Sequence, residues 1–395
     1  MFDYRWDGRK NSETPSSETL QNCDKNPEGI IKLSGGAVTG SRLQHVDAMR
    51  AIAVLLVVWT HYAEAFANFS GSQLFLNDIQ RSVNFGRIGV VIFFAISGFL
   101  IPSSLKGEKL PGTRRFIIRR FFRLYPAYWV SLPLGYTAVW WLNDRSLPAS
   151  DIVAGFSMVQ GVLGFEHIMG HYWTLETELF FYFGCLVLFW TGTIRKFGTI
   201  AGMSAVLGLA FCVVSAFHIV PDNWHGAYKG LLFHLSIMFW GACVRCAYDG
   251  LTSRKENAGL IALTGFLLLL GMAIFTKGVL ASEHSHIASG LAYMVGLLAF
   301  LFFLTCWKIH NGVASWLGKI SYSLYLLHPV SLYVVSWICT SYGLTGWPLG
   351  LYTVAALMPA LLLGWISYEA IERTGIMVSD RLTERSKQMQ VVPAI

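Results

Sequence analysis

The stretch DAMRAIAVLLVVWTH, residues 47–61, decides the fold, because it reads as a membrane-spanning helix with a cation near one end and an imidazole at the other. Arg50 and His61 are about three helical turns apart, so both side chains lie on one face, roughly 16 Å apart along the axis. Ionisable groups inside a bilayer are costly and usually face a cavity or a partner. A polar clamp between helices, with Arg50 as a topological charge, also explains each residue taken alone.

The composition supports a membrane protein. The chain has 395 residues, of which 54% are hydrophobic and 13% charged, whereas soluble domains average about 25% charged residues. The net charge of +7 does not indicate nucleic-acid binding, because the basic residues cluster at the ends of apolar runs, where membrane topology accounts for them. We therefore expect membrane lipid as a partner and no nucleic acid.

Ten apolar runs of roughly 20 residues, the length that crosses a bilayer, predict an all-α polytopic membrane protein with about ten transmembrane helices. We place the domain at residues 46–375, between a disordered cytoplasmic tail (1–45) and a second cytoplasmic tail (376–395). Residues 150–168 are weakly apolar and predict an interfacial or re-entrant segment. The predicted spans lie near 46–66, 86–105, 124–142, 172–192, 198–219, 230–248, 258–276, 287–306, 320–340 and 348–368.

Lysine and arginine predict the orientation of these spans. With the N-terminus in the cytoplasm, 23 of the 30 basic residues fall in inside segments and five in outside segments. The excess on the inside predicts that both termini are cytoplasmic. The seven cysteines include a CxxC at Cys243 and Cys246, but no second pair completes a zinc site. We expect packing cysteines and no metal.

The second predicted span and the stretch at the start of the third give the next two motifs. In GRIGVVIFFAISGFLI, residues 86–101, small residues such as Ser97 allow close helix contact or close approach of a ligand. In RRFIIRRFFRLYPAYW, residues 114–129, Arg119, Arg120 and Arg123 cover one side if the stretch is helical. Arginine forks onto phosphate, which favours a polyphosphate ligand, although topology and anionic lipid explain the cluster equally well.

Two further stretches place polar groups inside predicted spans. In HYWTLETELFFY, residues 171–182, Glu176 and Glu178 cannot share a helical face, because a step of two residues turns about 200°. In LGKISYSLYLLHPV, residues 317–330, His328 lies near mid-span and just before a proline that disturbs the helix. The polarity of the first stretch at the start of a span indicates a role in catalysis or substrate binding. For His328 the alternative is a core histidine whose hydrogen bonds are satisfied.

Together these motifs resemble acyltransferase family 3, the integral-membrane O-acyltransferases of bacterial surface polysaccharides. The resemblance covers roughly residues 43–375. Departures are Leu179, where the family commonly has a second glutamate, Glu176, where a small residue is usual, and Thr374, where proline is common. The matching pieces are R-x10-H (Arg50, His61), GVVIFFAISGFL (89–100), FIIRRFFRLYP (116–126), WTLETELFFY (173–182), ISYSLYLLHP (320–329) and EAIER (369–373).

The resemblance implies a domain of ten or eleven membrane helices in the bacterial inner membrane. It implies transfer of an acyl group, usually acetyl from acetyl-CoA, from the cytoplasmic side to a hydroxyl of a surface or exported glycan. The implied partners are acyl-CoA, a carbohydrate or glycolipid acceptor and membrane lipid, with no metal. A homo-oligomer is left open.

The motifs and the resemblance together assign roles to individual residues. His61 would act as general base or transient acyl carrier, and Arg50 would orient CoA or stabilise negative charge. Glu178 would set a histidine tautomer or bind the acceptor. The predicted residues are catalytic His61, Arg50 and Glu178; acyl-CoA-binding Arg119, Arg120, Arg123 and Ser97; and acceptor-binding Trp173, Glu176, Tyr322 and His328.

Two other classes of function compete with this prediction. A multi-pass transporter would use Arg50 and His61 as an intramembrane relay, but no inverted repeat is visible in the sequence. A membrane scaffold would keep its function when the arginines become lysines, whereas forked phosphate recognition would not. Turnover of labelled acetyl-CoA separates the enzyme from both.

Overall fold

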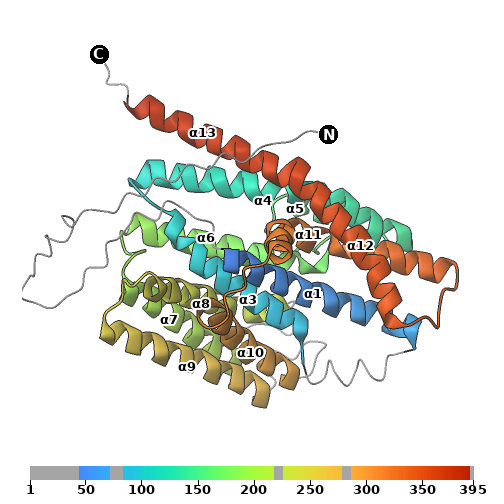
Figure 1. Ribbon diagram of the computed structural model, residues 1–395, viewed down its shortest axis with the longest axis horizontal. Coiled ribbons are helices and arrows are strands. Elements are labelled where there is room, and N and C mark those ends of the chain that lie inside the picture. The colour runs from blue at the N-terminus through green and yellow to red at the C-terminus, as the bar shows by residue number, and fades with distance from the viewer. Residues whose placement is uncertain (1–43, 72–82, 218–225, 278–285, 392–395) are drawn as a thin grey trace, which may run out of the picture. The chain divides into compact units, whose positions relative to one another are not determined.

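The computed structural model describes residues 44–71, 83–217, 226–277 and 286–391 (Figure 1). The predicted tail at 1–45 falls almost entirely outside these residues. No strand occurs among the described residues, which confirms the all-α prediction. The helices are α1 (Gln44–Ser70), α3 (Phe85–Leu100), α4 (Lys109–Val139), α5 (Ala149–Gly155), α6 (Trp173–Trp190), α7 (Phe197–Ala216), α8 (Gly226–Tyr248), α9 (Arg254–Lys277), α10 (His286–Thr305), α11 (Gly312–Ser341), α12 (Leu349–Ser367) and α13 (Arg373–Val391).

Each of the ten predicted spans coincides with a helix. In the part of the chain that the structure describes, eight helices are long and apolar enough to cross a membrane. The other two, α4 and α6, match the predicted spans 124–142 and 172–192 but are more polar, since α4 carries the arginine stretch and α6 carries both glutamates. The number of spans and the orientation of the termini stay predictions.

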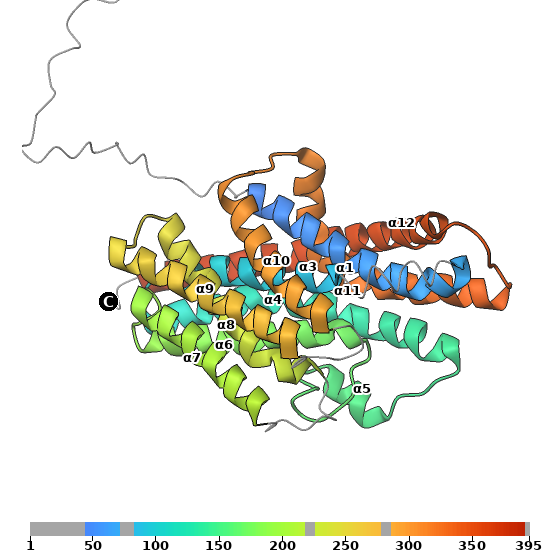
Figure 2. The same cartoon turned by 90° about the horizontal axis from the view of Figure 1, so that it is seen from below.

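The helices form two groups around α3. On one side α1 packs with α11 and α12, and on the other α7, α8, α9 and α10 pack together (Figure 2). Helix α3 contacts both groups through α1, α8 and α10. Two glycines make these contacts close: a Cβ at Gly89 would overlap the Ala53 carbonyl of α1, and one at Gly98 would overlap the Met238 carbonyl of α8. Both therefore serve helix packing, one of the two predicted roles.

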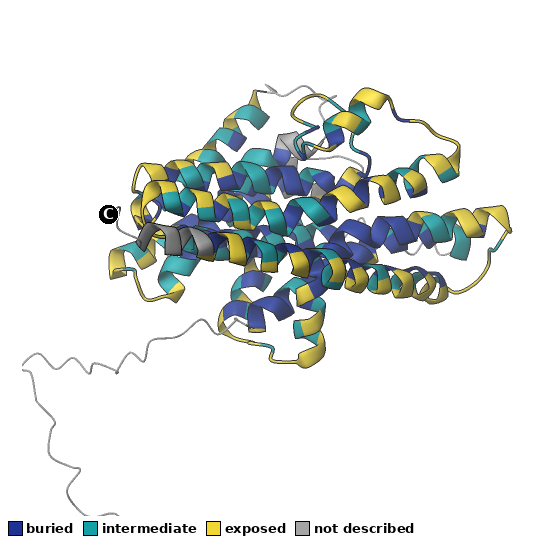
Figure 3. Ribbon diagram, turned by 90° about the horizontal axis from the view of Figure 1, so that it is seen from above, coloured by how far each residue is buried: buried dark blue, intermediate teal, exposed yellow. Residues whose placement is uncertain are grey.

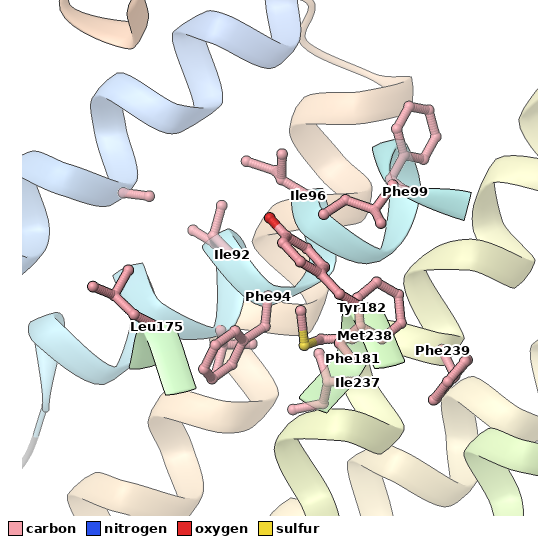
Figure 4. Packing of buried hydrophobic residues seen from close by; sticks show 14 of the residues in the cluster. Ile92, Phe94, Ile96, Phe99, Leu175, Phe181, Tyr182, Ile237, Met238 and Phe239 are labelled. Atoms are coloured by element: carbon pink, nitrogen blue, oxygen red, sulfur yellow. The ribbon is translucent and has the colours of Figure 1, made fainter. Parts of the chain in front are cut away.

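The core is continuous across α3, α6 and α8. Figure 4 shows aromatic and aliphatic side chains of these helices meeting in one packed layer, among them Phe94, Phe181 and Met238. Large apolar residues on outer faces are exposed instead, such as Ile261 on α9 and Val206 on α7, and Figure 3 shows the buried residues in the interior of the bundle. A broad apolar exterior is what lipid contact requires.

Helix α4 begins about fifteen residues before the predicted span, at Lys109, and includes the arginine stretch. Arginine has a high helix propensity, so this polar extension continues the helix. The segment at 150–168 folds back against α4 as short α5 and a series of turns. It is held by hydrogen bonds from the Tyr128 hydroxyl to the Gly155 carbonyl, 2.6 Å, and from the Tyr125 hydroxyl to the Ser157 carbonyl, 3.1 Å.

The chain after α12 stays helical. A five-residue π-helical turn, Tyr368–Glu372, joins α12 to α13, and α13 packs along α4. The predicted tail from residue 376 is thus a helix up to Val391. Pro126 in α4 lacks an N–H, which leaves the Phe122 carbonyl without its helical donor, and Gly375 of α13 lies against that oxygen.

Candidate active site

Three imidazoles from distant parts of the chain meet between α1 and α11. His61 of α1 lies against His328 of α11, with 5.4 Å between ring centroids and 28° between ring planes. His171, in the 3-10 turn Gly170–Tyr172 before α6, lies 5.3 Å from His328 on the same measure. His328 is fully buried and His171 is 8% exposed. We call these three residues the histidine cluster.

The backbone of α11 holds His328 in a defined orientation. The helix continues through Pro329 from Gly312 to Ser341 rather than ending there. Because proline has no N–H, the carbonyl four residues earlier, that of Tyr325, loses its helical partner. His328 Nδ1 lies 2.8 Å from that oxygen. The disturbance predicted for the helix is therefore a local one, and the side chain of His328 compensates it.

Tyrosine hydroxyls fix the same region from two sides. The Tyr62 hydroxyl donates to the His328 carbonyl at 3.1 Å, which links α1 to α11. The Tyr325 hydroxyl donates to the His171 carbonyl at 3.1 Å and lies 2.7 Å from the Thr174 hydroxyl, which links α11 to the start of α6. These bonds couple the positions of the imidazoles to one another.

Arg50 lies about three turns from His61 on α1, as the spacing predicts. Its side chain is 19% exposed and pairs with Asp47 at 3.9 Å. It also lies within electrostatic reach of Glu178, Arg120 and Arg123. Arg50 therefore belongs to the charged groups around α4 and α6, whereas His61 belongs to the histidine cluster.

Glu178 joins α6 to α3. Its Oε1 accepts hydrogen bonds from the Tyr182 hydroxyl at 2.7 Å and from the Ser97 hydroxyl at 3.3 Å. Ser97 was predicted for the donor and Glu178 for catalysis, and the structure brings the two together. Glu176 points elsewhere, which confirms that the glutamates do not share a face. It is 2% exposed, accepts from the Val162 N–H at 2.8 Å, and lies 3.6 Å from His167 Nε2.

The arginine stretch borders a cavity of about 310 Å³, here called the arginine cavity. Arg120 lies with its guanidinium 5.6 Å from the Phe116 ring centroid and 5.5 Å from that of Tyr182. Arg119 pairs at 2.9 Å with Asp380 of α13, and both side chains are about half exposed. Arg123 is not part of the lining, although all three arginines lie in helix α4. The cavity is lined by Ser103, Ser104, Lys106, Arg115, Phe116, Arg119 and Arg120.

Two residues predicted to bind the acceptor, Trp173 and Tyr322, contact groups outside the histidine cluster. Trp173 stacks on His234 of α8, with ring centroids 5.2 Å apart, and Tyr322 donates its hydroxyl to the Leu124 carbonyl at 2.8 Å. His234 in turn lies 2.7 Å from the Tyr293 hydroxyl.

Sequence reasoning did not assign His171 or Asp380. His171 was visible in the same motif as Trp173, but Asp380 pairs with a residue 261 positions away, a contact that only the fold reveals.

Comparison with known proteins agrees with this architecture. The family model of the acyltransferase 3 domain matches residues 43–369. A Staphylococcus aureus (strain COL) protein named "Putative O-acetyltransferase" is 26% identical over 321 residues, 72% of this chain and 49% of that protein. O-acetyltransferase OatA of Staphylococcus aureus is 24% identical over 368 residues, 84% of this chain and 56% of that protein. A "Putative acetyltransferase" of Acidianus two-tailed virus is 22% identical over 246 residues, 62% of this chain and 72% of that protein.

The chain spans about half the length of the staphylococcal relatives that it matches. No solved structure matches it. The family match covers most of the chain and includes every residue of the histidine cluster and the predicted arginines. The chain therefore belongs to the acyltransferase 3 family, and its fold is that of an all-α, multi-pass membrane protein.

Proposed function

We propose that this protein transfers an acyl group, most simply acetyl, from acyl-CoA on the cytoplasmic side to a hydroxyl of a surface or exported glycan. The observation that supports it best is a series of contacts that leads from the arginine cavity to α1. Arg120 lies over the Tyr182 ring, Tyr182 bonds Glu178, and Glu178 lies within electrostatic reach of Arg50 on the helix of His61.

The arginine cavity suits the phosphates of CoA. Its guanidiniums offer forked, charge-assisted hydrogen bonds to phosphate, and its volume lies at the lower end of ligand pockets, about 300–1,000 Å³. That size fits the phosphate-bearing end of CoA rather than the whole molecule. The excess of basic residues around the arginine cavity supports a position of the cavity on the cytoplasmic side of the membrane. Bacterial inner-membrane location is part of the same proposal.

The thioester end then reaches α1. In the general-base route, His61 takes the proton of the acceptor hydroxyl and the oxygen attacks the acyl carbon. The C–O bond forms, the C–S bond breaks, and the thiolate of CoA receives the proton. In the acyl-carrier route, a nitrogen of His61 first attacks the acyl carbon, the C–S bond breaks, and the thiolate of CoA leaves with the imidazole proton. The acceptor hydroxyl then attacks the same carbon, the C–N bond breaks, and the hydroxyl proton returns to the imidazole. Arg50 stabilises the negative charge that develops in either route.

The test is turnover of acetyl-labelled CoA by the purified protein in proteoliposomes. We expect the wild type to release the free thiol of CoA, and His61→Ala to abolish release while inserting and purifying normally. Rapid quenching of the wild type distinguishes the two routes, because only the acyl carrier retains label on the protein. Uptake of intact acetyl-CoA without thiol release would indicate the transporter instead, and full activity of His61→Ala would refute the catalytic role.

The acceptor is identified by comparing a deletion strain with its parent. Mass spectrometry of the cell-surface glycans should show loss of an acyl substituent in the deletion strain, and restoration by the wild-type gene but not by His61→Ala. An unchanged glycan profile would contradict a surface glycan as acceptor, while leaving the acyltransferase activity to be judged by thiol release.

A further inference from the structure

His328 has a fixed protonation pattern, which follows from the backbone around it. A carbonyl oxygen only accepts hydrogen bonds, so the contact of 2.8 Å between His328 Nδ1 and the Tyr325 carbonyl places a hydrogen on Nδ1. In a neutral imidazole, Nε2 then carries the lone pair. Pro329 makes this assignment stable, because it leaves the Tyr325 carbonyl with no competing helical N–H.

The lone pair on His328 Nε2 accepts no hydrogen bond from any described residue. Nε2 is buried, and it has no hydrogen-bond partner among the described residues. The Nε2 of His171 is likewise buried, with no hydrogen-bond partner in the part of the chain that the structure describes. A buried acceptor without a donor is destabilising. Two such nitrogens beside His61 indicate a place where protons arrive during the reaction.

We infer that His328 is a proton-accepting positioning residue that acts through His61. The inference rests on the proposed function. His61 takes the proton of the acceptor hydroxyl and passes a proton to His328 Nε2, while the C–O bond forms and the C–S bond of the thioester breaks. The proton then returns through His61 to the thiolate of CoA, so both imidazoles end neutral. His171 is the next acceptor in line, 5.3 Å from His328 between ring centroids.

The surroundings of His328 favour a proton acceptor over an ion-pair partner. The titratable groups in ring contact with it are His61 and Tyr62 of α1, His171 of the turn before α6, and Tyr325 of its own helix. The Tyr62 hydroxyl, which bonds the His328 carbonyl, also bonds the Ala356 carbonyl of α12. Among the described residues, the hydrogen bonds and ring contacts of His328 involve no carboxylate, so its neutral form is the resting one.

Side-chain replacement separates proton acceptance from support of the helix. His328→Asn keeps an amide N–H able to bond the Tyr325 carbonyl but has no basic nitrogen, and His328→Gln reaches the Nε2 position without being a base. We expect both variants to lower kcat for thiol release about 100-fold, within the range of general acid–base effects, at unchanged KM for acetyl-CoA. The pH at half-maximal turnover should also shift. The matched control is His234→Asn. The ring of His234 is also buried and stacks on Trp173, and among the described residues its Nδ1 has no hydrogen-bond partner. We expect this variant to change kcat less than threefold.

The outcomes separate this inference from the proposed function. If the wild-type protein releases no CoA thiol, the proposed function itself is refuted. An active wild type with His328→Asn equal to it in kcat and pH profile overturns only the inference. A second measurement on the wild type needs no variant: thiol release in mixtures of H2O and D2O. A curved dependence on deuterium fraction, as for two protons in flight, supports the relay, and a linear dependence overturns it even if both variants fail to fold.

Discussion

The arginine cavity and the histidine cluster differ in their access to water. In the cavity, Arg119 is about half exposed and already paired with Asp380, while Arg120 is partly buried and lies against the rings of Phe116 and Tyr182. In the cluster, His328 is fully buried and its ring is held by a backbone carbonyl. One region presents partly exposed cations, and the other presents buried imidazoles, one of which is held by a backbone carbonyl.

Under the proposed function, this difference assigns binding of the acyl donor to the arginine cavity and proton transfer to the histidine cluster. Long exposed cations attract and hold an anionic donor, and salt screens their effect. Buried imidazoles contribute little to that attraction, but their fixed orientation lowers the barrier to proton transfer. Changes in the cavity should therefore raise KM for acetyl-CoA, and changes in the cluster should lower kcat.

The largest expected effect in this comparison belongs to Arg50, which stands between the two regions. Arg50→Met removes the cation that faces Glu178 and pairs with Asp47. We expect kcat to fall by about 100-fold, the loss typical for one electrostatic stabiliser, with a rise in KM as well. Steady-state thiol release measures both constants.

The control for Arg50 is Asp47→Asn, which breaks the same ion pair and keeps the guanidinium. We expect it to reduce kcat less than tenfold. If Asp47→Asn lowers kcat as much as Arg50→Met does, the ion pair between the two side chains supports turnover, rather than the free charge of Arg50. A loss of thermal stability with unchanged kinetics in Arg50→Met would remove Arg50 from the reaction altogether.

A smaller effect is expected inside the arginine cavity. Arg120→Gln removes a charge-assisted contact to phosphate, so we expect KM for acetyl-CoA to rise about tenfold, equivalent to roughly 1.4 kcal/mol, with kcat within threefold of the wild type. Added salt should raise KM less in the variant than in the wild type. A variant with unchanged KM but a large loss of kcat would contradict the division between binding and chemistry.

The sequence predicts the local parts of this site well. The spacing of Arg50 and His61 and the different faces of Glu176 and Glu178 follow from helical geometry alone. Ten apolar runs also locate ten helices. These features depend on neighbours within a few turns, which the sequence contains.

Long-range partners could not be predicted. Nothing local places His171 beside His328, because the two lie 157 positions apart in the sequence. Trp173, two residues from His171, stacks on His234, so one short motif serves two different neighbourhoods. The prediction for Pro329 named the disturbance of the helix but not its result, since the direction of a freed carbonyl depends on the side chain that meets it.

The smallest expected effect tests whether the pairing of Arg119 with Asp380 competes with the donor. Asp380→Asn removes the negative charge 2.9 Å from Arg119 and frees the guanidinium for phosphate. Because both side chains are about half exposed, the pair contributes only about 0.2–1 kcal/mol, and we expect KM for acetyl-CoA to fall two- to threefold with kcat unchanged. Arg119→Gln is the matched variant: it should raise KM slightly, and in its presence Asp380→Asn should have no further effect. A higher KM in Asp380→Asn would instead mean that the ion pair holds α13 against α4 in the geometry that the cavity needs, so that support of the cavity outweighs competition for its charge.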